Sequence, residues 1–365
     1  MDAARRHLAR LASSARPAGS PAEDMARRYC ADTLAALGFT VTEDAFEYST
    51  VPGRWATAAA GAISMIALAS AGHLGSRGDA TGALGVLGGV ALAAAVLGTW
   101  IARHGILRLP VGRTVGLNLR ASRGGADPGV WLVAHLDSKS QPVPIAARAV
   151  GIMTSAAVWL AALVVASAQV AGAPVQGWWV WIGVLGVVAA LPVAASVVGG
   201  GSPGAADNAS GVTALLLAAE GADPQVPVGI LLTSAEELGL AGARAIAATT
   251  RPAVAINCDT VDDDAPLLCL TAGARSSRVA DALGASARAL GLPLATRRLL
   301  PGILVDAVAL ADAGWECATL SAATWRTLRR VHTSRDTTAE LRGDGIVRAS
   351  AVLTGALRAL GERPR

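Results

Sequence analysis

The feature that most constrains this chain is a long uncharged stretch that ends abruptly at a carboxylate. No Asp, Glu, Lys or Arg occurs in residues 149–206, and Asp207 then follows within a frame of Gly, Ser and Ala residues. As helix, this stretch is long enough to cross the roughly 30 Å hydrocarbon core of a bilayer twice. The chain is therefore expected to present a polar group almost directly after it leaves a membrane.

The composition indicates that part of the chain lies in lipid. Hydrophobic residues make up 53% of the 365 residues, charged residues make up 16%, and the mean hydropathy is +0.47. An ordinary soluble domain carries about 25% charged residues. The net charge of +4 comes without a cluster of basic residues interleaved with aromatic ones, so no nucleic-acid partner is expected. The four cysteines show no CxxC spacing, which favours buried free thiols in a reducing compartment.

Four apolar segments predict two transmembrane hairpins. Residues 55–72 and 80–102 are separated by the polar sequence GHLGSRGDA. Residues 149–170 and 177–198 are separated by AGAPVQG, in which a proline and two glycines mark a turn. Tryptophans fall near the ends of these segments, where indole rings favour the membrane interface. We therefore expect an integral, multi-pass membrane protein with four transmembrane helices.

The hairpins interrupt one polar domain and predict the side on which it lies. Each hairpin goes out and back, so the residues before, between and after the hairpins share one side of the membrane. That side carries the basic flanking residues Arg54, Arg103, Arg108, Arg113, Lys139 and Arg148, whereas the far turns carry only Arg77. The positive-inside rule then places the polar domain in the cytoplasm. The expected boundaries are residues 1–50, 104–145 and 200–365 for the polar domain, and 51–103 and 146–199 for the hairpins.

The polar remainder alternates between strand-like and helix-like segments. Ser20, Pro21 and Glu23 form a capping box that starts a helix, which Gly38 ends. Other helical segments are expected at 208–222 and from residue 338 onward. Eight β-rich runs are expected to be strands, at residues 39–48, 115–122, 129–137, 228–236, 253–261, 266–273, 293–300 and 316–323. The predicted fold class is α/β, with a mixed β-sheet covered by helices.

Acidic and imidazole side chains stand where predicted strands end or helices begin. They are His135 and Asp137, Asp207, Glu236 and Glu237, Asp259, and His332 with Asp336. Taken alone, an Asp before a helix is usually an N-cap, and a lone histidine is more often structural than a ligand. Together, two histidines and three carboxylates are the ligands that a pair of zinc ions needs, with one carboxylate shared between the ions.

The motifs that hold these residues resemble a known family. AHLDS, GAADNASG, AEELGLAG, NCD and VHTSRDT occur in the order found in the di-zinc aminopeptidases of metallopeptidase clan MH, family twenty-eight, which also includes glutamate carboxypeptidase-like enzymes. The resemblance covers the polar sequence outside the hairpins. It implies a zinc exopeptidase fold of the phosphorylase/hydrolase type and two zinc ions per chain.

The resemblance also implies a role for each residue. His135 and Asp259 would hold one zinc ion, Glu237 and His332 the other, and Asp207 would bridge them. Glu236 would be the general base. Asp137 and Asp336 would orient His135 and His332, and Asp306 would line the wall of the site.

The expected function is that of a membrane-embedded zinc aminopeptidase that acts on a peptide or small amide, including membrane-associated ones. Two alternatives stay open: a single-zinc glutaminyl-cyclase-like acyltransferase or other amide hydrolase, and a non-catalytic membrane scaffold. Some relatives stabilise the oxyanion with a late tyrosine, whereas the tyrosines here are Tyr29 and Tyr48. Lys139, the single lysine, is expected to extend toward the bilayer interface, with binding of a substrate carboxylate as the alternative.

Overall fold

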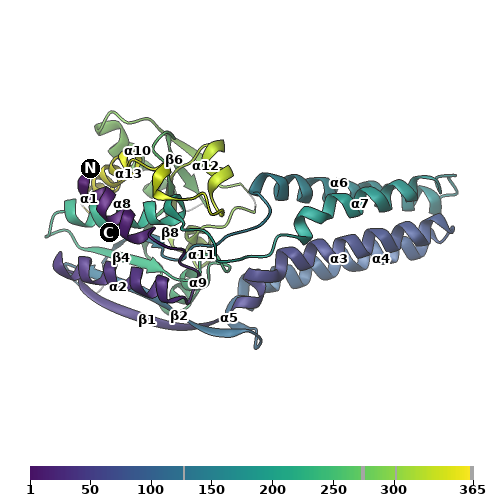
Figure 1. The fold of residues 1–365 in the computed structure, drawn as a ribbon, viewed down its shortest axis with the longest axis horizontal. Coiled ribbons are helices and arrows are strands. Elements are labelled where there is room, and N and C mark those ends of the chain that lie inside the picture. The colour runs from purple at the N-terminus through teal and green to yellow at the C-terminus, as the bar shows by residue number, and fades with distance from the viewer. Residues whose placement is uncertain (126–127, 273–275, 301, 362–365) are drawn as a thin grey trace. The chain divides into compact units, whose positions relative to one another are not determined.

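The computed structural model describes residues 1–125, 128–272, 276–300 and 302–361 (Figure 1). The chain forms two compact units. The first comprises Met1–Tyr48, Arg113–Ser140 and Gly200–Arg365, and the second comprises Ser49–Gly112 and Gln141–Gly199. The second unit therefore interrupts the first twice along the sequence. Residues 49–50, 104–112 and 141–145, which were predicted to belong to the polar domain, lie in the second unit.

The first unit is built on one sheet of eight strands, and the eight β-rich runs all form strands. The order across the sheet is β1-β2-β4-β3-β5-β8-β6-β7. The strands are β1 (Thr40–Ser49), β2 (Arg113–Arg123), β3 (Val130–His135), β4 (Val228–Thr233), β5 (Val254–Val261), β6 (Leu267–Thr271), β7 (Leu294–Arg298) and β8 (Glu316–Ala322).

The centre of the sheet is parallel. β4, β3, β5 and β8 run in the same direction, whereas β2 pairs antiparallel with β4, and β6 pairs antiparallel with β8. The sheet is thus mixed, as predicted. Every residue of β3 and β4 is buried, which is typical of parallel strands covered on both faces. In the register of these strands His135 lies opposite Thr233, so the segments that follow β3 and β4 start side by side at the same edge.

Helices cover both faces of the sheet. α8 (Ser210–Gly221) and α13 (Asp344–Gly361) contact β3 and β5, and α10 (Ser277–Ala289) packs against α13. On the opposite face α9 (Ala241–Thr249) and α11 (Asp306–Asp312) form a core with alternate strand residues, among them Val133 and Leu231. The sheet is therefore the middle layer of three.

Further helices of the first unit lie before β1 and after β8. They are α1 (Asp2–Leu11), α2 (Pro21–Ala36), α12 (Trp325–Arg330) and the short η3 (Thr338–Glu340). The predicted start of α2 is confirmed, because the Glu23 N–H donates to the Ser20 hydroxyl at 3.2 Å. After the helix ends, Gly38 adopts a φ of +80°, a conformation that favours glycine. The four cysteines are buried free thiols, as predicted.

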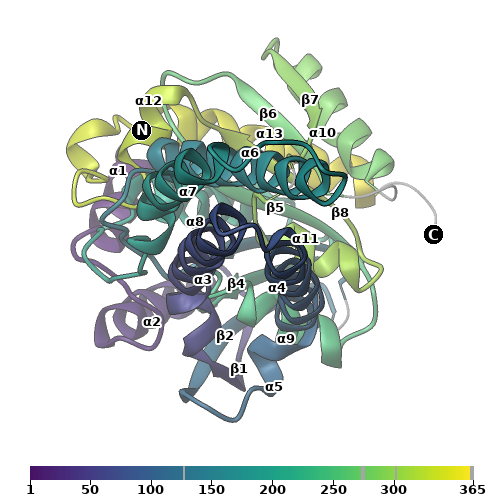
Figure 2. The ribbon, with the colours of Figure 1, turned by 90° about the vertical axis from the view of Figure 1, so that its right-hand side faces the viewer.

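The second unit consists of two helical hairpins, which Figure 2 views end-on. The first hairpin is α3 (Thr50–Ser76) and α4 (Ala80–Trp100), followed by η1 (Ile101–Gly105) and α5 (Ile106–Arg108), and the second is α6 (Ile145–Val170) and α7 (Trp178–Ala194). Within the described residues, the helical stretches Thr50–Ser76, Ala80–Arg108 and Ile145–Val170 are long and apolar enough to cross a membrane. The fourth helix is shorter than the predicted segment 177–198. α7 has 17 residues, and Pro192 lies inside it near its end.

Glycines allow α3 and α7 to approach closely. The indole of Trp179 is 1% exposed and lies directly against Gly75, where any β-carbon would overlap the ring. Trp179 Nε1 donates to Gln169 Oε1 at 2.5 Å, and Gln169 Nε2 donates to the Gly75 carbonyl at 2.9 Å. Three helices are thereby joined by hydrogen bonds within an apolar unit, where an unpaired polar group is costly.

We expect Gly75→Ala to destabilise the helical unit and Gly85→Ala to leave it unchanged or more stable. Alanine favours a helix over glycine by about 1 kcal/mol, and nothing lies within 4 Å of a β-carbon at Gly85. At Gly75 the overlap with Trp179 outweighs this gain. Thermal unfolding of the two purified variants, followed by circular dichroism, measures the difference. Equal unfolding temperatures would contradict the packing described here.

Candidate metal centre

The candidate ligands come from separate elements and meet at the carboxyl edge of the parallel strands. His135 is the last residue of β3, Glu236 and Glu237 lie in the turn after β4, and Asp259 lies near the end of β5. Asp207 belongs to the segment η2 (Ala205–Ala209), and His332 follows α12. The side chains of His332 and Asp207 are the most exposed of the six, at 14% and 10%. The edge of an open α/β sheet is where such folds place ligand sites.

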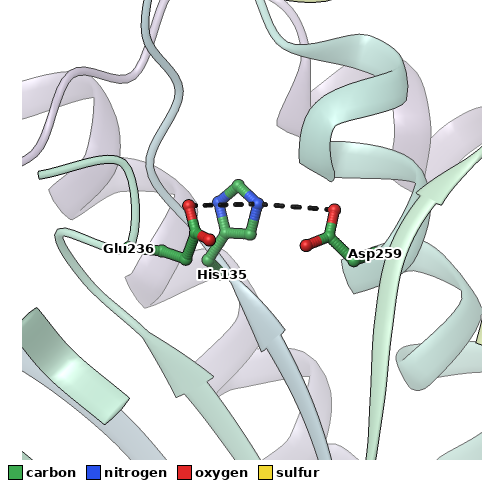
Figure 3. A group of neighbouring side chains, drawn as sticks. All are labelled: His135, Glu236 and Asp259. Atoms are coloured by element: carbon green, nitrogen blue, oxygen red, sulfur yellow. Dashed lines mark ion pairs between the residues drawn. The ribbon is translucent and has the colours of Figure 1, made fainter. Parts of the chain in front are cut away.

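One group of possible metal ligands consists of His135, Glu236 and Asp259. His135 Nε2 lies 3.8 Å from Asp259 Oδ1 and 4.0 Å from Glu236 Oε2. Figure 3 shows the two carboxylates reaching the imidazole from opposite sides. A cation between these three side chains would relieve the repulsion between the two carboxylates.

A second group consists of Asp207, Glu237 and His332. His332 Nε2 lies 3.0 Å from Asp207 Oδ2 and 3.4 Å from Glu237 Oε1. The other oxygen of Asp207, Oδ1, lies 3.1 Å from His135 Nε2 in the first group. Asp207 therefore turns one oxygen to each group, which is the geometry of a bridging carboxylate.

These residues fit a pair of zinc ions. Ligands bound tetrahedrally at about 2.0–2.2 Å from zinc stand roughly 3.3–3.6 Å from one another. The separations within the two groups, from 3.0 to 4.0 Å, lie around that value. In the described part of the chain, the buried Oε1 of Glu237 accepts no hydrogen bond, as expected for an oxygen that serves as a metal ligand.

Asp137 holds the two glutamates by their backbone. Its Oδ1 accepts the N–H of Glu236 at 3.0 Å, and its Oδ2 accepts the N–H of Glu237 at 3.1 Å. The ring Nδ1 of His135 lies 3.0 Å from the Asp137 carbonyl oxygen and 3.7 Å from the carboxylate. Asp137 thus lies beside His135 as expected, but the nearer contact is made by its main chain, and its carboxylate fixes the turn after β4.

Asp336 does not orient His332 in the way the sequence analysis expected. Its carboxylate oxygens accept the N–H groups of Ala206 and Asp207 at 2.8 and 3.1 Å. The Nδ1 atom of His332 has no hydrogen-bond partner among the described residues. The difference arises because Asp336 is fully buried beneath η2, where the unpaired backbone donors of that segment need an acceptor.

Asp306, predicted to line the wall of the site, is the first residue of α11 and lies close enough to His135 to feel its charge. Its Oδ2 accepts the hydroxyl hydrogen of Thr233 at 2.5 Å, and its side chain is fully buried. Burial raises the pKa of Asp306 to about 7. Burial also raises the pKa of Glu236 well above its usual range, and the charges of Glu237, Asp259 and Asp306 add to this effect.

Lys139 lies in the metal centre, so the prediction that it extends toward a bilayer interface is wrong. Its Nζ is 2.5 Å from Glu237 Oε2, and its side chain is 18% exposed. Burial alone would raise the pKa of Glu237, but the charges of Lys139 and His332 outweigh burial and lower it to about 2. The signal in the sequence was the place of Lys139, two residues after Asp137 at the strand end.

Two further residues that hold the site were not singled out from the sequence. Arg16 is 2% exposed and donates to the carbonyl oxygens of Leu136 at 2.8 Å and Gly204 at 3.1 Å. Asn208 donates to the Cys258 carbonyl at 2.9 Å and accepts the N–H of Thr260 at 3.2 Å. Arg16 thus joins the segments that carry His135 and Asp207, and Asn208 joins Asp207 to β5.

Glu23 on α2 is a buried carboxyl close to Asp137. Its side chain accepts the Gly19 N–H at 2.6 Å through Oε2, whereas Oε1 has no partner in the described chain. Burial and the charge of Asp137 raise the pKa of Glu23 to about 7 from an ordinary value of 4.5. Between these values the folded state holds a proton that the unfolded state has lost, so the stability contributed by this residue falls as pH rises.

We expect Glu23→Gln to remove this pH dependence. Glutamine keeps an acceptor for the Gly19 N–H and has no charge to bury, so the variant should gain on the order of 2 kcal/mol at pH 8 and little at pH 4.5. Thermal unfolding from pH 4.5 to 8 measures the effect, with the exposed Glu220→Gln as the matched control. Parallel stability curves for Glu23→Gln and the parent protein would show that Glu23 is charged in the folded state.

Comparison with known proteins identifies the enzyme class. Residues 191–356 match the sequence model of Peptidase family M28. A search of curated proteins returned no match. The match and the two ligand groups confirm the predicted class, a zinc metallopeptidase, and the predicted two metal positions.

Solved structures show the same fold at low sequence identity. A zinc aminopeptidase from Bacillus subtilis is 14% identical with a TM-score of 0.59, covering 100% of this chain and 96% of that one. An aminopeptidase from Aneurinibacillus sp. strain AM-1 is 14% identical with a TM-score of 0.58, covering 100% and 94%. A glutaminyl cyclase from Fimbriiglobus ruber is 15% identical with a TM-score of 0.56, covering 98% and 94%.

Proposed function

We propose that this protein is a membrane-embedded zinc aminopeptidase. The observation that carries the proposal is the placement of Asp207, whose two carboxylate oxygens lie 3.1 and 3.0 Å from the imidazoles of His135 and His332. A single carboxylate shared in this way is the mark of a two-metal hydrolytic site. His135 and Asp259 would hold one ion, Glu237 and His332 the other, and Asp207 both.

The chemistry divides between the metals and Glu236. When bound, a zinc pair lowers the pKa of a water molecule and polarises the scissile carbonyl. Glu236 accepts a proton from the attacking water and returns it to the leaving amine. Its place 4.0 Å from His135 Nε2 and its raised pKa suit a group that must take up and release a proton. Asp137 holds Glu236 in this place through the backbone.

The substrate that fits this site is a peptide or small amide with a free amino terminus. The site is rich in carboxylates: after burial, the charges of Asp259 and Asp306 help to raise the pKa of Glu236, and the charge of Asp259 helps to raise that of Asp306. An ammonium group near them is favoured by their charge. A blocked amino terminus removes that charge, so free and acetylated substrates should differ.

Two alternatives are disfavoured by the same residues. A single-zinc acyltransferase of the glutaminyl-cyclase kind has no need for a second complete ligand group, and a scaffold has no need for a positioned general base. Both groups are complete here, and Glu236 is held by a hydrogen bond from its own backbone to Asp137.

We expect Glu236→Gln to keep two zinc ions and lose at least a hundredfold in turnover, because a positioned general base contributes about 10²–10⁴ to the rate. Asp207→Asn should instead lose zinc, because the two oxygens of Asp207 face one ligand group each. The measurements are zinc content and hydrolysis of aminoacyl amides, with the N-acetylated amides as control substrates. In the parent protein, a chelator should abolish hydrolysis and zinc should restore it.

Each alternative predicts a different result. One zinc ion per chain, with cyclisation of glutaminyl peptides, would identify the acyltransferase. No zinc and no hydrolysis would identify the scaffold. Equal zinc content and equal residual rates in the two variants would contradict the division of roles between Glu236 and Asp207.

We also propose that both hairpins cross the membrane and that the metal centre faces the cytoplasm. The apolar character of the hairpin helices and the arginines Arg54, Arg103, Arg108 and Arg148 at one end of the hairpins support this. The chain from Asp137 to the start of α6 at Ile145 spans at most about 29 Å when extended. Substrates with an apolar body that lies in the interface are therefore favoured.

Single cysteines can test this orientation. In a protein whose four native cysteines are replaced, we expect Ser76→Cys, in the first hairpin turn, to react with an impermeant thiol reagent in intact cells. Ser334→Cys, beside His332, should react only after the cells are permeabilised. Both side chains are exposed, so access to the reagent is limited only by the membrane. The reverse pattern would place the metal centre outside the cytoplasm.

A further inference from the structure

The ion pair between Lys139 and Glu237 makes the two ligand groups chemically different. Lys139 Nζ lies 2.5 Å from Glu237 Oε2, and the side chains are 18% and 4% exposed. This is a short, largely desolvated contact, in which charge acts more strongly than at a surface. Lys139 is also the single lysine of the chain.

The contact leaves one oxygen of Glu237 for a metal. Oε2 is engaged by Lys139, whereas Oε1 accepts no hydrogen bond in the described chain and lies 3.4 Å from His332 Nε2. Glu237 can therefore offer a single oxygen to a metal at the second ligand group. The ammonium group of Lys139 also offsets part of the negative charge of this carboxylate. In the first group, Asp259 pairs with no Lys or Arg side chain among the described ion pairs.

We propose that Lys139 is a positioning residue that makes the two metal positions unequal, by holding Oε2 of Glu237 and weakening the position formed by Glu237 and His332. This inference rests on the proposed two-zinc site. Lys139 restricts Glu237 to one ligand oxygen and places a positive charge next to the second ion, which disfavours that ion by Coulomb repulsion. The position of His135 and Asp259 fills first, and the second fills at higher zinc concentration.

The test is a zinc titration of the full-length, metal-stripped protein against a chromogenic chelator. The parent protein should bind two zinc ions in two steps. In Lys139→Met the weaker step should tighten at least tenfold while the tighter step stays within about threefold, because methionine keeps the bulk of the side chain and removes its charge. Lys139→Arg retains the charge and should restore the weak second step. Arg342→Met, which removes the exposed ion pair with Asp264 at 2.7 Å, is the matched control.

The possible outcomes separate this inference from the proposed function. Loss of the second zinc in Lys139→Met would mean that Lys139 supports the ligand rather than weakening the site, and would overturn the proposal. An unchanged titration would overturn it as well, while leaving the two-zinc site intact. A parent protein that binds no zinc would overturn the proposed function itself. Because zinc binding is the readout, none of these results depends on finding the physiological substrate.

Discussion

The metal centre depends on the compensation of buried negative charge. Asp207, Glu236, Glu237 and Asp259 are all buried and lie at one edge of the sheet. Isolated carboxylates are too costly to bury, so such a cluster must gain positive partners or take up protons. Lys139 compensates one of the four by direct contact. When bound at the two candidate ligand groups, a pair of divalent cations would compensate the rest.

Two buried carboxylates outside the candidate ligand groups stabilise the backbone that carries the candidate ligands. Asp137 accepts the N–H groups of Glu236 and Glu237, and Asp336 accepts those of Ala206 and Asp207. The two arrangements are alike: one buried carboxylate holds two consecutive backbone donors beneath a ligand. Such outer partners orient metal ligands and limit their movement. Arg16 adds a third support, since its guanidinium binds carbonyl oxygens on both sides of the site.

The two units have separate cores, which explains how one sequence accommodates both. The core of the first unit packs α9 and α11 against the sheet, and that of the second packs residues such as Leu68, Leu87 and Trp179 between helices. Some polar side chains of the second unit are paired within it, as Gln169 is with Trp179 and Gly75. An insertion with its own packing leaves the order of strands in the sheet unchanged. The interrupted segments still form one eight-stranded sheet.

Local sequence patterns predicted the helices and strands of the fold. They also identified the candidate residues of the site. Continuous apolar runs bounded by turn residues predicted the strands β3, β4 and β5, and their ends identified His135, Glu236 and Asp259. The sequence also predicted the two helical hairpins, because a long apolar segment without charged residues fits few environments. The fourth predicted span was the exception, since α7 ends at Ala194 although the uncharged run continues beyond it.

The tertiary structure decided which atoms meet. The sequence placed Lys139 near an apolar segment, but the fold brings it to Glu237, 98 positions away along the chain. It likewise turns Asp336 toward the backbone of Asp207 instead of toward its neighbour His332. Composition and periodicity determine which segments are strands, amphipathic helices or long apolar helices, because those depend on neighbouring residues. The pairing of charges and backbone donors depends on residues far apart in the chain, which come together only when the sheet has formed.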